Sequence, residues 1–301
     1  MQAHFRVPAT SANLGPGFDC LGLALDLWNE TSFSLTGQGL SIEVHGEGQD
    51  TLPAEKNNLI IQAAARVYET IAVDFPSDFA IRCSNRIPLS SGLGSSAAAV
   101  LTGLMGANTL AGNPLSEMEI FHLAMELEGH PDNISAALYG GLTLSMMDNG
   151  SSTIKQLDCH PFDLIVILPE VSLSTQDARD ALPKQVDLGD AVFNASHTAL
   201  TIDALRSGNL PLLRQAMQDR VHQPYRLPLI SGAAEALTAA QNCGAAAALS
   251  GAGPSVIAFS KGNRDELAEQ MQTAFADKGI RSRTFKLTLA TSGAEPFPAL
   301  A

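Results

Sequence analysis

A segment rich in glycine and serine, Pro88–Ala98, restricts how this chain can fold more than any other stretch. Before it, Phe79–Ile87 alternates apolar and polar residues as a strand does. After it, Ala97–Leu110 is small and apolar all round, as in a buried helix. Gly92 and Gly94 permit backbone angles that other residues avoid, so successive N–H groups can converge on one point. The segment therefore predicts a strand-to-helix turn that binds an anion at the helix N-terminus.

The serines of this turn favour phosphate as the anion. Their hydroxyls can donate to phosphate oxygens or ligate Mg²⁺. The alternative is a plain turn, in which glycine serves geometry and serine caps the helix. Four serines and two glycines before an alanine-rich helix favour the phosphate site, and the serines are Ser90, Ser91, Ser95 and Ser96.

Other nucleotide-binding motifs fit this chain less well. Gly92–Ala97 has the form of a dinucleotide fingerprint, but Pro88–Ser91 separates the strand from the first glycine. The following stretch, Ala98–Ser116, also lacks the acidic residue that would bind a ribose. The chain contains neither the Gly-Lys pair of a Walker A motif nor the His-Arg-Asp triplet of protein kinases.

The charge balance excludes two classes of partner. With 18 basic and 31 acidic residues, the 301-residue chain has a formal net charge of −13. Nucleic acids and anionic membranes bind basic surfaces, so we expect neither as a partner. No stretch is apolar for long enough to span a bilayer, and Met1–Arg6 lacks the apolar run of a signal peptide. We therefore expect a soluble, cytoplasmic protein.

The cysteines do not suggest a metal site or a disulfide framework. They are far apart and form no CxxC pair: Cys20, Cys83, Cys159 and Cys243. We expect buried, reduced thiols.

Strand-like and helix-like patterns alternate without the regular rhythm of a doubly wound sheet, which predicts an α+β fold with mixed or antiparallel sheets. Asp148–Ser152 is the most linker-like stretch, so we expect domains at residues 1–150 and 151–301. The expected strands are Phe5–Pro8, Leu21–Leu35, Leu40–Val44, Phe79–Ile87, Leu142–Met146, Leu164–Leu168, Ala246–Phe259 with an interruption at Ser250–Ser255, and Arg283–Leu289. The expected helices are Asn58–Ile71, Ala97–Leu110, Ser116–Glu128 with a capping box, Ile134–Tyr139, Thr175–Ala181, Ala191–Arg206, Leu210–Arg220 and Arg264–Lys278.

Three segments resemble motifs of the GHMP kinases, named for galactose, homoserine, mevalonate and phosphomevalonate. Pro88–Ala98 is similar to their P-x-x-x-G-L-G-S-S-A-A motif, residue for residue. Val7–Gly22 resembles their N-terminal motif in the form found in homoserine kinases, and Leu249–Ser255 resembles their third motif. The segments follow the expected order and span nearly the whole chain.

The resemblance implies a two-domain fold with a ribosomal-protein-S5-like N-terminal part and a ferredoxin-like C-terminal part. It implies a kinase that uses ATP and Mg²⁺ to phosphorylate the side-chain hydroxyl of L-homoserine. It also implies a homodimer, although no residue pattern in the chain shows one.

The resemblance assigns ATP to the glycine- and serine-rich loop and to the start of the first helix. Mg²⁺ would be held by Ser95 or Ser96 and by Glu128, with Glu126 as the fallback. The adenine would lie near Asn57, Asn58 and Leu59, which read equally well as a helix cap and core. The loop residues implied in ATP binding are Pro88, Leu89, Ser90, Ser91, Gly92, Leu93, Gly94, Ser95, Ser96, Ala97 and Ala98. The third motif would bring its backbone close to this loop.

The substrate residues are also carried over from the resemblance. Arg179 and Arg226 would bind the carboxylate of the amino acid through parallel hydrogen bonds. Thr175 would donate near the transferred phosphate, Asp19 would hold the ammonium or hydroxyl group, and Asn13 would bond the hydroxyl or the backbone.

Three neighbouring residues, His130, Asp132 and Asn133, would complete the pocket. Some GHMP kinases have a catalytic aspartate in the place that Asn133 fills here. An amide cannot act as a base, so we predict direct attack by the hydroxyl without a strong side-chain base. Asp132 is the alternative base.

Two other functions remain as alternatives. One is a kinase of the same superfamily acting on mevalonate or a related alcohol, which Arg179, Arg226 and the spacing from Asn13 to Asp19 disfavour. The other is a sensor that binds ATP and a ligand without turnover, which the loop serines and Glu128 disfavour.

Overall fold

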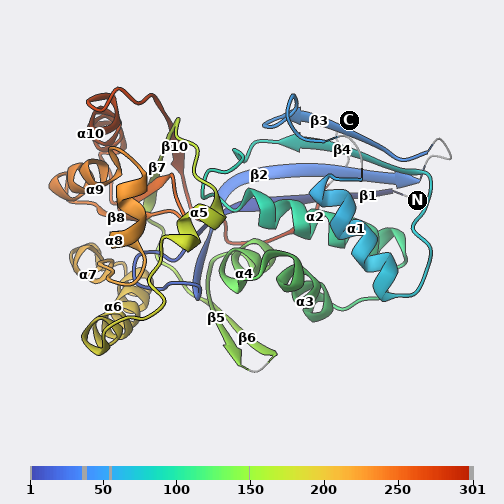
Figure 1. Ribbon diagram of the computed structural model, residues 1–301, viewed down its shortest axis with the longest axis horizontal. Helices are drawn as coiled ribbons and strands as arrows, with labels where there is room; N and C mark the ends of the chain where they lie inside the picture. Colours follow the sequence, from blue (N-terminus) through green and yellow to red (C-terminus); the bar gives the residue numbers. More distant parts are fainter. Residues whose placement is uncertain (1, 36–38, 54–55, 149, 298–301) are drawn as a thin grey trace.

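Two β-sheets with helices packed on them form the fold, as the computed structural model shows (Figure 1). The structure describes residues 2–35, 39–53, 56–148 and 150–297. The first sheet has the order β11-β1-β2-β4-β3, and β5 pairs with both β2 and β6. Its pairings are antiparallel except for the parallel pair β3–β4. Its strands are β1 (Gln2–Ala12), β2 (Leu21–Leu35), β3 (Ser41–Gly46), β4 (Phe79–Asn85), β5 (Leu142–Asp148), β6 (Ser151–Leu157) and β11 (Glu295–Pro296).

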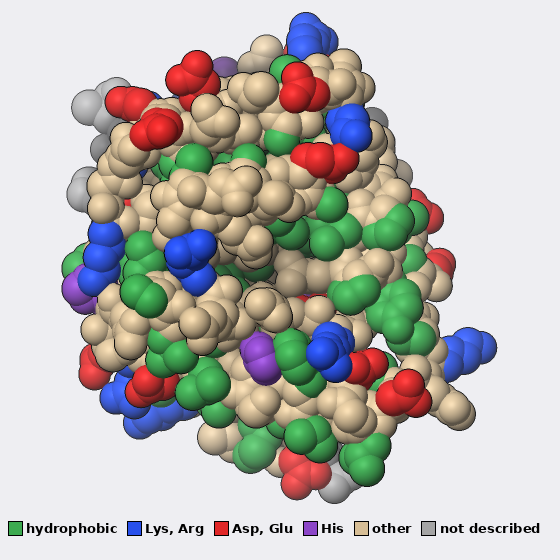
Figure 2. All heavy atoms as spheres, turned by 90° about the vertical axis from the view of Figure 1, so that its left-hand side faces the viewer, with side chains coloured by type: hydrophobic (Ala, Val, Ile, Leu, Met, Phe, Trp, Pro, Cys, Tyr) green, Lys and Arg blue, Asp and Glu red, His purple; other side chains and the backbone are tan. Residues whose placement is uncertain are grey.

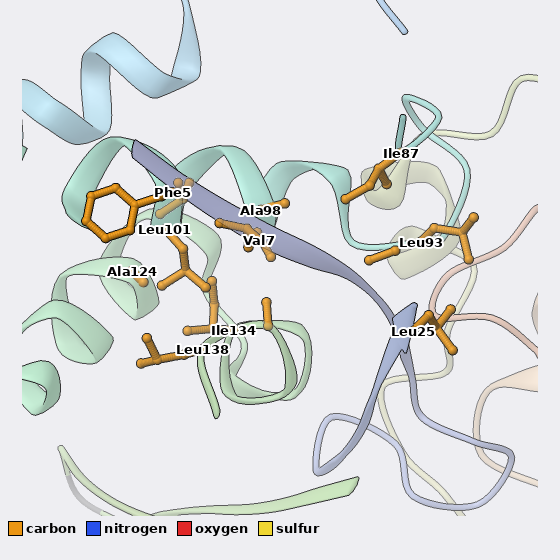
Figure 3. Close-up of a cluster of buried hydrophobic side chains, with 14 of the residues drawn as sticks. Phe5, Val7, Leu25, Ile87, Leu93, Ala98, Leu101, Ala124, Ile134 and Leu138 are labelled. Carbon is orange, nitrogen blue, oxygen red and sulfur yellow. The ribbon is translucent and has the colours of Figure 1, made fainter. Parts of the chain in front are cut away.

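Four helices lie beside this sheet (Figure 1). They are α1 (Leu59–Thr70), α2 (Ser95–Leu110), α3 (Glu117–Glu128) and α4 (Pro131–Tyr139). α2 is buried nearly all round and packs on β1, which explains its small, apolar sequence. Figure 3 shows the core between them, where Val7 of β1 lies beside Ala98 and Leu101 of α2.

Local sequence signals set the ends of two of these helices. Asn58 caps α1 by accepting a hydrogen bond from the Ile60 N–H at 3.0 Å. Ser116 and Glu119 form the predicted capping box at the start of α3. Both helices therefore begin where the sequence predicts.

The second sheet is antiparallel, with the order β10-β7-β9-β8. Its strands are β7 (Asp163–Pro169), β8 (Ala246–Leu249), β9 (Val256–Ser260) and β10 (Ser282–Leu287). Alternate residues of β7 enter different hydrophobic clusters, so both faces of the sheet are covered. The helices of this half are α5 (Thr175–Asp180), α6 (Leu188–Ser207), α7 (Leu210–Ala216), α8 (Gln223–Arg226), α9 (Ala233–Asn242) and α10 (Arg264–Ala276), with a 3₁₀ turn at Leu227–Leu229.

The α+β class with mixed and antiparallel sheets is confirmed, but the expected linker is wrong. Asp148 and Ser151 pair at the end of the hairpin β5–β6, and Asn149 lies outside the described residues. The boundary expected at residue 150 therefore falls inside a hairpin of the first sheet. The chain leaves that sheet after Leu157 and enters the second at Asp163.

Other boundaries also differ from the sequence predictions. β1 continues to Ala12, where we expected a loop from Ala9, because Ala9–Ala12 pairs with β2 beyond a bulge. α4 begins at Pro131 rather than after Asn133, and α7 ends at Ala216 rather than Arg220. Four elements, β6, α8, α9 and β11, were not predicted from the sequence.

One face of the molecule carries apolar side chains among scattered charges of both signs (Figure 2). Four large apolar side chains on or just before α6 are exposed: Val186, Leu188, Val192 and Leu200. Cys243 is exposed too, contrary to the expectation of four buried thiols; Cys83 is buried and the other two are half-buried. Within the described part of the chain, no helix is long and apolar enough to cross a membrane.

Candidate active site

A cavity of about 470 Å³ lies where the two sheets approach each other, and residues of all three motifs line it. Most of the side chains predicted for the site meet there. Those lining the cavity are Asn13, Asp19, Asn58, Leu89, Ser90, Ser91, Gly92, Gly94, Ser95, Ser96, Glu128, His130, Asp132, Asn133, Thr175, Arg179 and Arg226. Segments more than 200 residues apart in the chain therefore form one site.

Backbone contacts join the three motifs. The Thr10 N–H donates to the Leu93 carbonyl at 3.0 Å, which ties the first motif to the phosphate loop. The Ser250 hydroxyl donates to the Gly92 carbonyl at 2.7 Å, and the Gly251 N–H donates to the Ala12 carbonyl at 3.1 Å. The prediction that the third motif brings its backbone close to the loop is confirmed.

The glycines of the phosphate loop are required by close packing as well as by conformation. Gly92 has φ of 76°, and a Cβ there would overlap the Ser250 carbonyl oxygen and lie 2.7 Å from that of Gly253. Gly94 has φ of 68° and precedes α2, and a Cβ there would overlap the Thr10 hydroxyl. Only glycine fits at either position, and the helix N-terminus stays open toward the cavity.

The loop serines are not equivalent. The Ser91 hydroxyl is buried and donates to the Pro88 carbonyl at 2.7 Å, so it stabilises the loop itself. Ser90, Ser95 and Ser96 line the cavity and are half-buried or exposed. These three hydroxyls can reach a ligand.

Four residues predicted to bind ATP do not line the cavity: Pro88, Leu93, Ala97 and Ala98. Leu93, Ala97 and Ala98 are fully buried in the hydrophobic core, and Figure 3 shows Leu93 and Ala98 there. Their side chains support the loop from behind, so only their backbone groups can contribute to a phosphate site.

A carboxylate stands beside the loop. Glu128, the last residue of α3, accepts a hydrogen bond from the Ser96 hydroxyl at 3.0 Å. Burial raises the pKa of Glu128, and the Ser96 hydrogen bond partly offsets this shift. The fallback ligand, Glu126, pairs instead with Arg66 at 2.8 Å on the surface and does not line the cavity.

The start of α4 carries a polar network. Thr10 Oγ1 donates to Asn133 Oδ1 at 2.7 Å, so the amide oxygen of Asn133 is engaged. Asp132 is buried, and its Oδ1 accepts from the Asn133 N–H at 2.7 Å. His130 Nδ1 lies 3.2 Å from the same oxygen, and this hydrogen bond raises the pKa of His130.

An ion pair also lines the cavity, close enough to His130 to affect its pKa. Arg179 on α5 binds Asp19 with two hydrogen bonds, Nη2 to Oδ1 at 2.9 Å and Nη1 to Oδ2 at 3.2 Å. Thr175 lies one turn earlier on α5 and is exposed to the cavity. Asn13 holds the loop that carries Asp19, because its amide donates to the Gly251 carbonyl and accepts from the Asp19 N–H.

Arg226 is a buried guanidinium without a carboxylate bound to it. Its exposed fraction is 1%, and it forms no ion pair with any carboxylate of the described residues. Its Nε donates to the Ala178 carbonyl at 3.1 Å. Burial lowers the pKa of Arg226, and the charge of Arg179 lowers it further. Such a group is suited to an incoming anion.

Part of the lining is apolar and includes Val44, Leu52, Leu59 and Leu89. Asn58 lines it too, but both ends of its amide are engaged, with the Ile60 N–H and the Pro53 carbonyl. The structure therefore gives Asn58 a capping role and leaves an apolar pocket of the kind that receives an aromatic base.

The sequence analysis assigned no role to three residues that shape the site. They are Thr10, which orients Asn133, and Phe18 and His222, which contact Arg226. Thr10 and Phe18 stand inside the recognised first motif. The spacing of four residues between His222 and Arg226 on a helical turn was the available signal for the third.

The two ends of the site differ in the groups that can bind a ligand. The described lining residues include two arginines and no lysine, and both arginines lie at the Asp19 end. At the other end, backbone N–H groups and serine hydroxyls are the donors. The site can hold a polyphosphate beside a small zwitterion.

Comparison with known proteins agrees with this geometry. Residues 58–141 match the model of the GHMP kinases N terminal domain, and residues 201–277 match that of the GHMP kinases C terminal domain. The chain is 43% identical to a homoserine kinase of Moorella thermoacetica over 291 residues, covering 96% of this chain and 98% of the relative. It is also 43% identical to a homoserine kinase of Synechococcus over 300 residues, with 98% of each chain covered.

The fold is shared with solved structures. A crystal structure of homoserine kinase from Cytophaga hutchinsonii superposes with a TM-score of 0.86 and 29% identity, covering 98% of this chain and 97% of the other. A mevalonate kinase of L. major shares the fold at a TM-score of 0.70, with 20% identity. The family models, the nearly full-length relatives and the shared architecture together place this chain in the GHMP kinase family, among its homoserine kinases.

Proposed function

We propose that this protein transfers the γ-phosphate of ATP to the side-chain hydroxyl of L-homoserine. The observation that carries the proposal is the buried, carboxylate-free guanidinium of Arg226 in the cavity that the phosphate loop also lines. An amino acid supplies the carboxylate that this group lacks. Alcohols without a carboxylate, such as aminopropanol, leave it unpaired at a cost of several kcal/mol.

Homoserine binding rearranges the ion pair between Arg179 and Asp19. Their bidentate pair offers a guanidinium for the substrate carboxylate and a carboxylate for its ammonium group. The ammonium group then pairs with Asp19 and the carboxylate is shared by Arg179 and Arg226, so neither arginine is left without a carboxylate. This exchange favours a substrate with both groups on one carbon.

The residues beside the loop fit Mg²⁺. The Ser96 hydroxyl and the Glu128 carboxylate are 3.0 Å apart and are hard oxygen ligands, with Ser95 as the neighbouring hydroxyl. Mg²⁺ neutralises phosphate charge when bound. Burial disfavours the charged form of Glu128, and a bound cation offsets this effect.

The reaction proceeds by direct attack of the substrate hydroxyl on the γ-phosphate, without a strong side-chain base. The new O–P bond forms as the bond to ADP breaks, and the hydroxyl proton passes to the γ-phosphate or to water. Asn133 is an amide whose oxygen already accepts from Thr10. The Asp132 carboxylate is buried and faces the Asn133 N–H and His130. Catalysis then consists of positioning the hydroxyl in line with the γ-phosphate and stabilising the charge with loop donors.

The variant Asp132→Asn tests the absence of a base. We expect kcat to fall by no more than about tenfold, because the amide retains an acceptor for the Asn133 N–H. Steady-state turnover and homoserine KM check this result. Loss of nearly all turnover with unchanged KM would identify Asp132 as the base and contradict direct attack.

One assay separates the proposed function from its alternatives. ADP release is measured with ATP and Mg²⁺ in the presence of L-homoserine or mevalonate. We expect ADP with homoserine only. ADP with mevalonate alone would indicate a different alcohol kinase, and binding of both ATP and homoserine without ADP would indicate a sensor.

The protein is also proposed to be a homodimer. The exposed apolar side chains on and near α6 support association with a second copy (Figure 2). Sedimentation equilibrium measures the mass directly. Twice the chain mass of 31.6 kDa is expected, and a single chain mass at micromolar concentration would contradict it.

A further inference from the structure

A fully buried histidine lies behind Arg226. His222 has an exposed fraction of 0% and precedes α8, the short helix that carries Arg226. Its Nδ1 is 3.3 Å from Arg226 Nη1, and its Nε2 is 2.7 Å from the Gly15 carbonyl oxygen. The histidine therefore bridges the guanidinium and the loop of the first motif.

The two partners of His222 determine its protonation. A carbonyl oxygen only accepts, so Nε2 carries a hydrogen and donates to Gly15. A guanidinium only donates, so Nδ1 is unprotonated and accepts from Arg226. His222 is therefore neutral and in a single tautomer. Burial is the largest effect on the pKa of His222 and lowers it. The Asp219 carboxylate, 3.6 Å from Nε2, raises the pKa and Arg226 lowers it, and the net shift is downward, in agreement with this assignment.

We propose that His222 is a positioning residue for the substrate carboxylate, which fixes Arg226 relative to the first-motif loop by accepting its hydrogen bond and donating to Gly15. The inference rests on the proposed binding of homoserine by Arg226. It adds a residue that touches neither substrate nor ATP and acts through the arginine.

The surroundings hold this bridge rigidly. The buried Asp219 carboxylate accepts from the N–H groups of Val221, His222 and Gln223, at 2.6 to 3.0 Å, and so fixes the start of α8. The Phe18 ring stacks on His222 with centroids 5.3 Å apart and lies under Arg226 at 5.2 Å. The imidazole and the guanidinium are thus confined by one aromatic surface.

The bridge links two groups that must act on the same substrate. Gly15 lies in the loop that ends in Asp19, and Arg226 Nη1 also lies 3.4 Å from the Gly251 carbonyl, which Asn13 contacts. These contacts therefore fix the position of Arg226, which receives the carboxylate, relative to Asp19, which receives the ammonium group. A displaced guanidinium would weaken homoserine binding without disturbing the phosphate loop.

Two amide variants separate the halves of the bridge. His222→Asn retains an acceptor near the Nδ1 position, whereas His222→Gln places its amide near the Nε2 position and leaves Arg226 without this acceptor. We expect homoserine KM to rise at least tenfold in His222→Gln and by about threefold or less in His222→Asn, because bonds to charged groups are strong. The ATP KM is expected to stay within about twofold in both, since the loop is untouched.

A substrate without a carboxylate supplies the specific readout. 3-Aminopropan-1-ol keeps the hydroxyl and ammonium groups of homoserine, and kcat/KM for it is expected to be the same in parent and His222→Gln. Arg226→Gln is the reference variant, and it should reproduce the homoserine defect. An unaltered homoserine KM in Arg226→Gln would overturn the proposed carboxylate site and this inference together.

Two results would overturn the role of His222 alone. One is a homoserine defect in Arg226→Gln with none in His222→Gln. The other is an equal loss with homoserine and 3-aminopropan-1-ol in His222→Gln, which would indicate general damage to the fold. Thermal unfolding of each variant shows whether it folds, and His222→Asn provides the comparison if His222→Gln does not.

Discussion

The two ends of the cavity are built from different parts of the chain. At the phosphate end, backbone groups of three motifs contact one another, and glycines allow the contacts. At the amino-acid end, charged side chains such as Asp19 and Arg179 define the site and a buried imidazole supports it. The phosphate end therefore depends on where the main chain runs, while the amino-acid end depends on side-chain chemistry.

This difference predicts how each end responds to substitution. Backbone-built sites fail when a side chain is added, because the neighbouring main chain cannot move aside. Side-chain-built sites fail when a group is removed or changes protonation. Side chains of the amino-acid end can therefore change while the backbone of the phosphate end stays the same. This is consistent with one fold shared by kinases for different alcohols.

The substitution Gly92→Ala should produce the largest effect, at the backbone-built end. The added methyl group overlaps the Ser250 carbonyl at a position with φ of 76°, so the loop and the third motif must separate. We expect kcat/KM for ATP to fall on the order of 1000-fold, because several phosphate donors move together. Steady-state kinetics with varied ATP checks it.

Gly112→Ala is the matched control for this substitution. Gly112 also has a left-handed φ, of 89°, but a Cβ there would meet nothing within 4 Å. It should cost only about 1–2 kcal/mol of stability from backbone strain, with kcat/KM nearly unchanged. Equal losses of kcat/KM in the two variants would show that backbone strain, rather than a clash between motifs, causes the loss in Gly92→Ala.

A second substitution tests the carboxylate that is hydrogen-bonded to the phosphate loop. Glu128→Gln removes the negative charge of a proposed Mg²⁺ ligand. We therefore expect kcat to fall on the order of 100-fold and the Mg²⁺ concentration needed for half-maximal rate to rise. Glu126→Gln, on the same helix but paired with Arg66 at the surface, is the control and should be nearly silent. Rates measured over a Mg²⁺ titration distinguish the two. A silent Glu128→Gln would contradict a role for Glu128 as a Mg²⁺ ligand.

The smallest effect is expected from pH, at the side-chain-built end. Burial lowers the folded-state pKa of His222 below the ordinary value of 6.5, so the unfolded chain binds this proton more readily. Stability contributed by neutral His222 is therefore complete above pH 6.5 and is lost as the pH falls below it. Between pH 7.5 and 5.5 the loss is at most about 1.4 kcal/mol.

Urea unfolding at both pH values measures this loss by comparison with His222→Gln, whose amide does not titrate. The parent should lose more unfolding free energy on acidification than the variant. His130, whose pKa is raised by Asp132, is present in both proteins and cancels in the difference. A parent that loses no more than the variant would contradict a neutral His222.

The parts of the fold that the sequence predicts correctly have local signals. Asn58 begins α1 and Ser116 with Glu119 begins α3 because a cap is formed within a few residues. The strand β6 was missed because its exposed, polar residues become a strand only by pairing with β5. A hairpin turn and a linker have similar compositions. The domain boundary was therefore predicted at Asp148–Ser152, which forms the end of a hairpin.

The site shows the same limit. The motifs located the phosphate loop and the segments that pack against it, because each motif is continuous in sequence. The pairing of Asp19 with Arg179 joins residues 160 positions apart, and no local pattern predicts which charges meet. The bridging role of His222 depends on a carbonyl 207 positions away, at Gly15, and so became visible only in three dimensions.

The short strand β11 has a consequence for how the molecule is made. It pairs with Phe5 and Arg6 at the edge of β1, and the paired residues Arg6 and Glu295 are 289 positions apart. At about 5–20 residues per second, a ribosome needs roughly 15–60 seconds to travel from one to the other. During that interval the growing chain presents an unprotected strand edge, which can pair with a neighbouring nascent chain. Synthesis of β11 ends this exposure at Phe5 and Arg6, so translation speed sets how long these two positions stay unpaired.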